Sequence, residues 1–240
     1  DSSIGYLARL PAAQELFWNG FHHATDSYIL GERDLDNERA LNLDLAVVGR
    51  HGPWRTRLEG YFYRFFRYIY QAPRVTETGE ALPDPFHGSP VWALTSVAAR
   101  VYGLALAQDY RHRLGAGEWH AGIKLEALRG VADGGENLPR MMPYTAGAHL
   151  GYAWSAWQTR IAYERVDRSR HEAENETPTD GYGWLSASLT WTPPLGSGEL
   201  SVQLKGENLT DSLARNHLSF LKATAPLPGR QVSLALRWRP

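Results

Sequence analysis

Histidine and carboxylate side chains gather in the polar stretches of this 240-residue chain. Imidazole nitrogen with carboxylate oxygen is a donor set that suits Zn²⁺ or Cu²⁺, and one or two imidazoles suffice as axial ligands of a haem. A histidine in a polar loop is more often only solvated, and the adjacent pair His22–His23 stands out against that alternative. The candidate ligand residues are His22, His23, Asp26, His87, His171 and His217.

Motifs for catalysis are absent from the sequence. There is no Gly-x-Ser-x-Gly, no His-Glu-x-x-His and no phosphate-binding Gly-x-x-x-x-Gly-Lys, and His171-Glu172 lacks the second histidine of a zinc protease. The chain has no cysteine, which excludes disulfides and thiolate sites. Its 25 basic and 26 acidic residues are nearly balanced, so the bulk charge does not favour nucleic acid. We therefore predict a protein that is not an enzyme, requires no cofactor and binds no nucleic acid.

The elements that would position these side chains are strands, because apolar and polar residues alternate with a period of two. In 38–50, for example, Leu41, Leu43 and Leu45 alternate with Asn42 and Asp44. No apolar run reaches the roughly 18 residues of a membrane helix, whereas a membrane barrel strand needs only about 9–11 residues. Ten strands are predicted, at 4–10, 38–50, 54–70, 91–113, 118–133, 143–153, 157–168, 181–193, 198–208 and 230–240.

The connections between these strands alternate strictly in length. Turns of three or four residues occupy 51–53, 114–117, 154–156 and 194–197, and long loops occupy 11–37, 71–90, 134–142, 169–180 and 209–229. All long loops would then lie at one end of the strands. Outer-membrane barrels show this asymmetry, whereas Greek-key sandwiches have no reason to. The fold class predicted is all-β, a transmembrane antiparallel β-barrel.

The two faces of the strands differ in polarity. Tryptophans cluster near the short turns, as expected for rings that sit at a membrane–water interface. The side chains predicted to face lipid are Leu43, Leu58, Ile123, Leu150, Leu189 and Leu234. The charged side chains predicted to face inward are Arg55, Arg57, Glu59, Arg100, Lys124, Glu126, Lys205 and Arg237. So many inward charges favour a sector of a barrel wider than ten strands.

Short motifs occur along nearly the whole chain. Arg9-Leu10-Pro11 with Glu15-Leu16-Phe17 has the form Arg-x-Pro…Glu-Leu-Tyr/Phe, and Gly20–Thr25 has the form Gly-x-His-x-Ala-Thr. Glu207–Asp211 contains Asn-Leu-Thr-Asp ahead of the last long loop. Together with segments 61–63, 68–70 and 215–230, these stretches resemble the C-terminal part of TonB-dependent outer-membrane receptors. Segment 215–230 is most similar to the branch linked with zinc and haem uptake.

The resemblance implies a 22-stranded barrel with an N-terminal plug, of which residues 1–240 would be the C-terminal barrel portion. The expected location is the outer membrane of a Gram-negative cell, and the expected partners are outer-membrane lipid, the TonB complex acting through the plug, and the missing N-terminal strands or a second polypeptide. Zinc or haem is the expected cargo, with Phe21 and Phe220 as apolar walls for haem. The chain departs from the family in ending Trp238-Arg239-Pro240, where an aromatic residue is usual, and in having Ala105 and Ala107 where relatives often have inward carboxylates.

Other interpretations remain open from the sequence. A siderophore or copper receptor would have the same fold. A stand-alone ten-stranded outer-membrane protein, either an adhesin or a barrel enzyme, would have the same strand pattern. A soluble carbohydrate-binding sandwich would need no membrane, and detergent dependence would distinguish it from the others.

Overall fold

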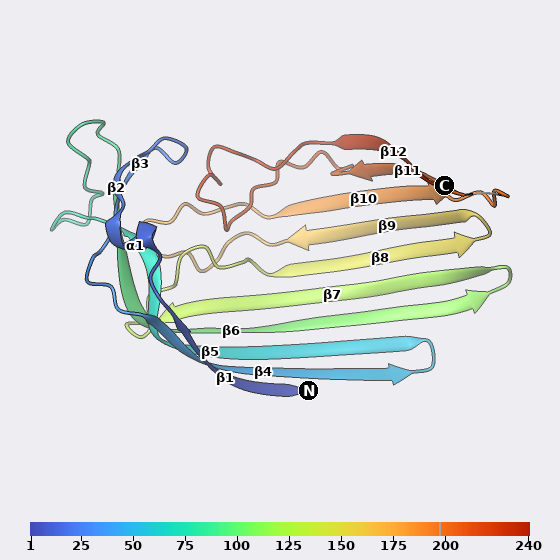
Figure 1. The fold of residues 1–240 in the computed structure, drawn as a ribbon, viewed down its shortest axis with the longest axis horizontal. Helices are drawn as coiled ribbons and strands as arrows, with labels where there is room; N and C mark the ends of the chain where they lie inside the picture. The colour runs from blue at the N-terminus through green and yellow to red at the C-terminus, as the bar shows by residue number, and fades with distance from the viewer. Residues whose placement is uncertain (197) are drawn as a thin grey trace.

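A computed structural model describes residues 1–196 and 198–240, so Ser197, in the predicted turn 194–197, lies outside the described residues. Ten strands form an antiparallel meander in the order β1-β4-β5-β6-β7-β8-β9-β10-β11-β12 (Figure 1). Their bounds are β1 Ser2–Arg9, β4 Glu38–His51, β5 Trp54–Pro73, β6 Val91–Leu114, β7 Gly117–Ala132, β8 Thr145–Trp154, β9 Trp157–Val166, β10 Tyr182–Trp191, β11 Glu199–Glu207 and β12 Gln231–Arg239. All ten predicted strands are confirmed, with ends shifted by a few residues.

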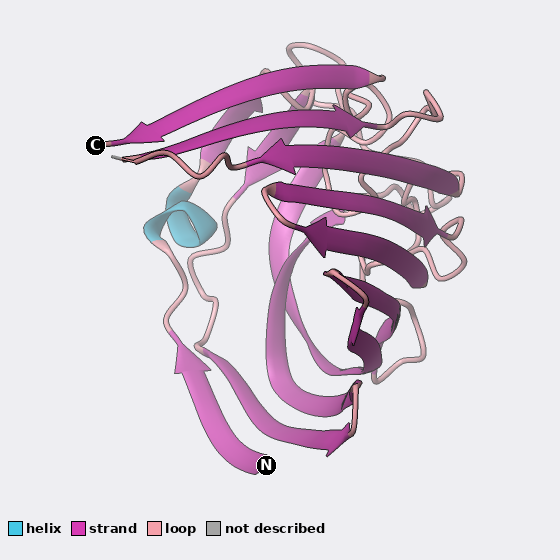
Figure 2. Ribbon diagram, turned by 90° about the vertical axis from the view of Figure 1, so that its right-hand side faces the viewer, coloured by secondary structure: helices cyan, strands magenta, loops and turns pink. Residues whose placement is uncertain are grey.

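The sheet is an open arc (Figure 2). Strands β1 and β12 are its two edges, and neither is paired with the other among the described residues. The long loops lie together at one end of the strands and the short turns at the other, as predicted (Figure 1). Gly52 and Gly115 adopt positive φ values of 55° and 63° in two of the short turns, a conformation that glycine adopts without steric cost.

The sheet has an apolar face and a polar face. Cross-strand pairing aligns Leu58 with Leu106 and Leu106 with Leu125, so the apolar side chains continue across strands β5 to β7. The six side chains predicted to face lipid are all exposed, between 37% and 65%. Apolar side chains that are this exposed across several strands are costly in water and are expected in hydrocarbon. The strand pattern of a membrane barrel is therefore present in the folded chain.

Aromatic rings pair near the short turns. Trp157 stacks on Trp191 with ring centroids 5.8 Å apart, and Trp119 lies 4.6 Å from Tyr152. Trp54, the first residue of β5, lies 4.7 Å from Tyr110. The predicted cluster of tryptophans at the short-turn end is confirmed. Its rings lie at a similar height along their strands.

The stretch predicted as the loop 11–37 contains three further elements. These are the helix α1 (Ala13–Phe17) and the strands β2 (Asn19–His22) and β3 (Ser27–Leu30), which pair as a hairpin. Strand β3 also pairs in parallel with β6, where Ile29 is opposite Trp92. No helix among the described residues has the length and apolar character needed to span a bilayer.

Arg9 and Glu15, two residues of the family-like motifs, meet Glu38 beside α1. Arg9 Nη1 donates to Glu15 Oε2 at 2.7 Å, and Arg9 Nε donates to Glu38 Oε1 at 3.3 Å. Glu15 also accepts the Ala12 N–H at 2.7 Å, which satisfies a free donor at the start of the helix. Glu38 Oε2 accepts the Ile69 N–H at 2.9 Å. The ion pairs thus hold the hairpin-bearing segment against β4 and β5.

A small core lies where the loop 133–144 folds back onto the sheet. Leu138 is 1% exposed and packs with Ala99 and Ala132. Phe65, Tyr68 and Met141 pack around these three residues. This packing holds the loop 133–144 against the sheet. The end of the sheet that carries the long loops therefore has ordered structure of its own.

Candidate ligand-binding loops

Two of the predicted histidines pack against one phenyl ring. His87 stacks on Phe21 with centroids 4.2 Å apart, and His23 meets the same ring edge-on at 4.9 Å. Phe21 comes from β2, and His87 comes from the loop 74–90. Both imidazoles are exposed, and the neighbouring Phe86 is 79% exposed. We call Phe21, His23 and His87 the Phe21 cluster, and it offers imidazole nitrogen and apolar surface together at the loop end.

A buried carboxylate fixes the backbone beside His87. The Asp84 side chain is fully buried and accepts N–H groups from Phe86, His87 and Ser89 at 3.0–3.1 Å. Burial alone would raise the pKa of Asp84. The three backbone hydrogen bonds and a hydrogen bond with the His87 ring outweigh burial and hold the pKa of Asp84 below its ordinary value. Asp84 is therefore a structural anion that positions His87.

Asp26 and His22 lie in the turn of the β2–β3 hairpin. Asp26 has a positive φ of 46° and accepts a hydrogen bond from Ser89 Oγ at 2.9 Å, which joins the hairpin to the loop 74–90. His22 Nδ1 lies 2.9 Å from the Thr25 hydroxyl. The structure thus brings four predicted residues, His22, His23, Asp26 and His87, into one region of two adjoining segments.

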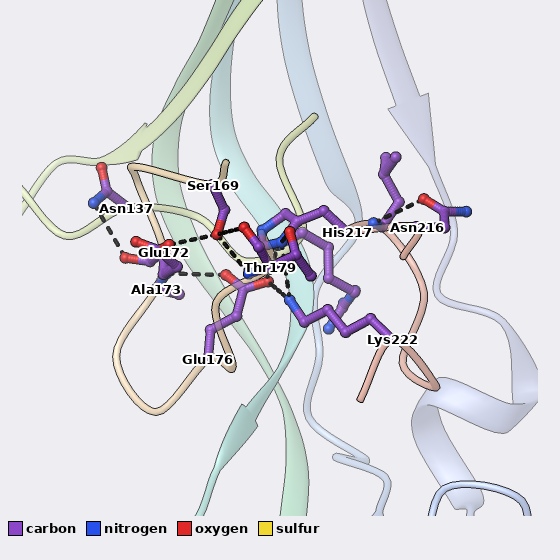
Figure 3. A network of polar contacts seen from close by, with 11 residues as sticks. Asn137, Ser169, Glu172, Ala173, Glu176, Thr179, Asn216, His217 and Lys222 are labelled. Carbon is purple, nitrogen blue, oxygen red and sulfur yellow. Dashed lines mark hydrogen bonds and ion pairs between the residues drawn. The ribbon is translucent and has the colours of Figure 1, made fainter. Parts of the chain in front are cut away.

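His217 lies in a different environment, a buried network that joins the loops 169–180 and 209–229 (Figure 3). Glu176 Oε1 accepts Lys222 Nζ at 2.5 Å and lies 3.3 Å from His217 Nε2. His217 Nδ1 lies 3.0 Å from the Thr179 hydroxyl. The side chains of Glu176, His217 and Lys222 are only 7%, 3% and 7% exposed. We call Glu176, Thr179, His217 and Lys222 the Glu176 network. Both ring nitrogens of His217 have a partner within it.

The network controls the charge of its members. Burial lowers the pKa of His217, and the Lys222 ammonium adds to that effect, so the imidazole is held neutral. Burial opposes ionisation of Glu176, but hydrogen bonds from Lys222 and from the backbone N–H groups of Ala173 and Arg140 outweigh it and lower its pKa. One carboxylate and one ammonium are thus paired out of water, with a neutral imidazole beside them.

The last long loop is closed at its base by Asn208, which is fully buried. Its Nδ2 donates to the carbonyls of Ser212 at 2.9 Å and Pro228 at 3.1 Å, and its Oδ1 accepts the Ser212 N–H at 2.9 Å. Asp211 Oδ1 accepts the Arg230 N–H at 2.9 Å. These bonds give a structural role to the Asn-Leu-Thr-Asp motif.

His171 is separate from both groups. Its Nε2 lies 3.5 Å from the Tyr144 hydroxyl, and the two rings meet edge-on at 6.3 Å. Among the described residues, no three His, Asp or Glu side chains form a group able to hold a metal. The structure does not bring the candidate ligand His217 together with His22, His23 and Asp26, because His217 is buried among partners from its own and a neighbouring loop.

Lys222, Thr179 and Arg140 take part in these contacts but carry no signal in the sequence that marks them as site residues. The structural role of the charged run 168–176 follows only from the buried partners of Glu176. Arg140 stacks on Phe220, with its guanidinium carbon 3.8 Å from the ring centroid. These two residues line a cavity of about 230 Å³ together with Tyr70 and Trp92. An aromatic wall of this kind suits an aromatic ligand.

Comparison with known proteins agrees with the resemblance of the motifs at the level of the family. A sequence model described as "TonB dependent receptor-like, beta-barrel" matches residues 3–209. That match includes nine of the ten meander strands and the Phe21 cluster.

Solved structures share the arrangement of the strands. The copper transporter OprC superposes with a TM-score of 0.75 at 19% identity, over 95% of this chain and 34% of that chain. The FrpB iron transporter from Neisseria meningitidis (F5-1 variant) gives 0.66 at 19% identity, over 98% and 36%. The siderophore receptor PirA from Acinetobacter baumannii gives 0.65 at 14% identity, over 98% and 38%. The chain spans about a third of the length of these proteins, and identities this low show the fold alone.

Proposed function

The chain belongs to the TonB-dependent receptor β-barrel family, and on that premise we propose that it forms part of the wall of an outer-membrane receptor that imports a scarce metal species with energy delivered through TonB. In this proposal the apolar face contacts lipid, the polar face lines the lumen, and the long loops face the cell exterior. TonB acts through a plug domain outside these 240 residues.

The edges of the sheet support a larger barrel. The outer backbone edges of β1 and β12 carry N–H and C=O groups without a strand partner among the described residues. Hydrocarbon does not tolerate such edges, so each needs a neighbouring strand. We propose that these strands come from the N-terminal part of the same barrel or from a second polypeptide.

For the cargo, the observation that carries the proposal is the Phe21 cluster. Two exposed imidazoles that share a phenyl ring, with Asp26 and Ser89 close by, provide ligands for a metal centre that prefers nitrogen. Zinc would use the imidazoles of His23 and His87 with further ligands from outside this cluster, whereas haem would use one imidazole and the apolar surface of Phe21 and Phe86. We propose zinc or haem as the cargo on this basis.

A ferric siderophore is the second candidate, and the cavity beside Phe220 favours it. Tyr70, Trp92 and Phe220 supply aromatic walls, and Arg140 supplies a cation over one of them. The aromatic rings of a catecholate chelate would find stacking partners there, and Glu136, Glu174 and Lys222 also line the cavity. Copper also binds imidazole, so a copper cargo would use the Phe21 cluster.

The test is uptake by cells that express the complete receptor. Labelled Zn²⁺, haem and a ferric catecholate are supplied separately, with TonB present or disrupted. We expect zinc or haem uptake to require TonB and to fall in His23→Ala/His87→Ala but not in His51→Ala, because His51 lies at the opposite end of the strands. Uptake of the ferric catecholate alone, reduced by Phe220→Ala, would favour the second candidate. Uptake of all three without TonB would contradict the proposal.

A further inference from the structure

Small residues leave a groove in the apolar face between β4 and β7. One row of paired residues crosses these strands as Leu45, Gly60, Leu104 and Ala127. Gly60 and Ala127 flank Leu104 without covering it, and a methyl group added at Gly60 would lie 3.2 Å from Leu104 Cδ2. The resulting groove has a volume of about 630 Å³ and is also lined by Leu43 and Phe62. An acyl chain has the shape and polarity to lie in it.

An arginine without a partner stands at the loop-side rim of the groove. The next row toward the loops is Leu43, Phe62, Tyr102 and Arg129. Arg129 Nε is buried and has no hydrogen-bond partner, and Arg129 forms no ion pair within the described part of the chain. A buried donor on a charged group is costly unless an acceptor reaches it. Arg129 lines the groove, so an acceptor there would come from a molecule in the groove.

A second available cation lies one row further toward the loops. That row contains Leu41, Arg64, Arg100 and Val131. Arg64 is occupied, because its Nη2 donates to Asp133 Oδ2 at 2.6 Å. Arg100 is exposed and forms no ion pair within the described residues, and this outward position corrects its prediction as an inward residue. Rows are two residues apart, so Arg100 and Arg129 are separated by about 7 Å along the strands.

We propose that this face holds one phosphorylated, acylated lipid of the outer leaflet, with an acyl chain in the groove and a phosphate between Arg129 and Arg100. The order along the strands is the order of such a lipid: an apolar groove, a buried donor at its rim, and an exposed cation beyond it on the side of the long loops. Guanidinium is well suited to phosphate because its N–H groups form paired hydrogen bonds with phosphate oxygens. The site rests on the outer-membrane location proposed above and is independent of the cargo.

The test uses the complete receptor in detergent, with native mass spectrometry of the bound lipid. The probes are diphosphoryl lipid A and the same lipid with both phosphates removed. We expect the phosphorylated probe to bind and Arg100→Gln/Arg129→Gln to weaken it about tenfold or more, since each arginine supplies charge-assisted hydrogen bonds. Ala127→Phe, which fills the groove and keeps both charges, should weaken both probes.

Arg237→Gln on the polar face is the matched control, because it removes one positive charge and should leave binding unchanged. Equal binding of the two probes, or unchanged binding in Arg100→Gln/Arg129→Gln, would overturn the site. Each variant is first assembled in phosphatidylcholine vesicles and checked for heat-dependent gel mobility. Failure of the wild type to assemble there would contradict the outer-membrane location itself and not the lipid site.

Discussion

The Phe21 cluster and the Glu176 network contain similar side chains in opposite surroundings. His23 and His87 are exposed and contact mainly an aromatic ring, whereas His217 is 4% exposed and has a partner at each ring nitrogen. A histidine in the first setting has nitrogen lone pairs available to a ligand. A histidine in the second holds loops together. Residue type alone does not separate these roles, but burial and partners do.

The largest effect is expected from Lys222→Met. The substitution leaves the Glu176 carboxylate buried without its ammonium, which typically costs about 3–5 kcal/mol. Hydrogen exchange of the complete receptor should show loss of protection in 169–180 and 209–229. Lys205→Met is the control, because the exposed pair Lys205–Glu207 at 3.0 Å contributes about 0–1 kcal/mol. Equal protection in the two variants would show that the Glu176 network does not hold the loops.

A similar contrast between environments applies to the faces of the strands. Leu189 is on the apolar face, and Ser188 pairs with Lys205 on the polar face. Arginine at Leu189 should cost about 2–4 kcal/mol if that level is near the bilayer midplane, and arginine at Ser188 much less. Urea titration of the receptor in vesicles measures both. Equal tolerance of Leu189→Arg and Ser188→Arg would contradict the assignment of the faces.

His217→Ala should have a smaller effect than Lys222→Met. The Lys222–Glu176 pair remains, and the main loss is the hydrogen-bond partner of the buried Thr179 hydroxyl, about 1–3 kcal/mol. Exchange in 209–229 should therefore increase moderately while affinity for Zn²⁺ and haem stays unchanged. A fall in the affinity for Zn²⁺ or haem without a change in hydrogen exchange would show that His217 binds the cargo and does not hold the loops.

Acid should open the loops in two stages. The folded pKa of His217 lies below its ordinary value of 6.5, so only the open state gains a proton as pH falls below 6.5, and stability falls from there. The folded pKa of Glu176 lies below 4.5, so the stability it contributes is present above pH 4.5 and is lost as pH falls through its folded pKa. Hydrogen exchange in 169–180 and 209–229, measured as a function of pH, should show both losses of stability in the wild type. In His217→Ala it should show only the loss at lower pH that is due to Glu176.

The strands were predictable because their signal is local and repeated. Alternation over eight or more residues identifies a strand, and the alternation of long and short connections identifies the end to which each loop belongs. The hairpin of β2 and β3 was missed, since each strand has four residues and β3 is held by pairing with the distant Val91–Ala93. Arg100 was assigned to the wrong face, although its pairing with Arg64 places it with the outward row.

The site was predictable in residue type but not in assembly. His22, His23 and Asp26 are neighbours in sequence, so their proximity follows directly. That His87 stacks on Phe21 depends on the path of the loop 74–90, which has no periodic pattern. The burial of His217 depends on Glu176, a residue of another loop, and no local feature of either loop indicates that they meet.

The most direct measurement of the central claim is calorimetry of the complete receptor with Zn²⁺ and with haem. Wild type, His23→Ala/His87→Ala and His217→Ala are compared at neutral pH. We expect the affinity of one cargo to fall about tenfold or more in His23→Ala/His87→Ala and to stay unchanged in His217→Ala. Unchanged affinity for both cargoes in His23→Ala/His87→Ala would contradict the claim that the exposed Phe21 cluster captures the metal species.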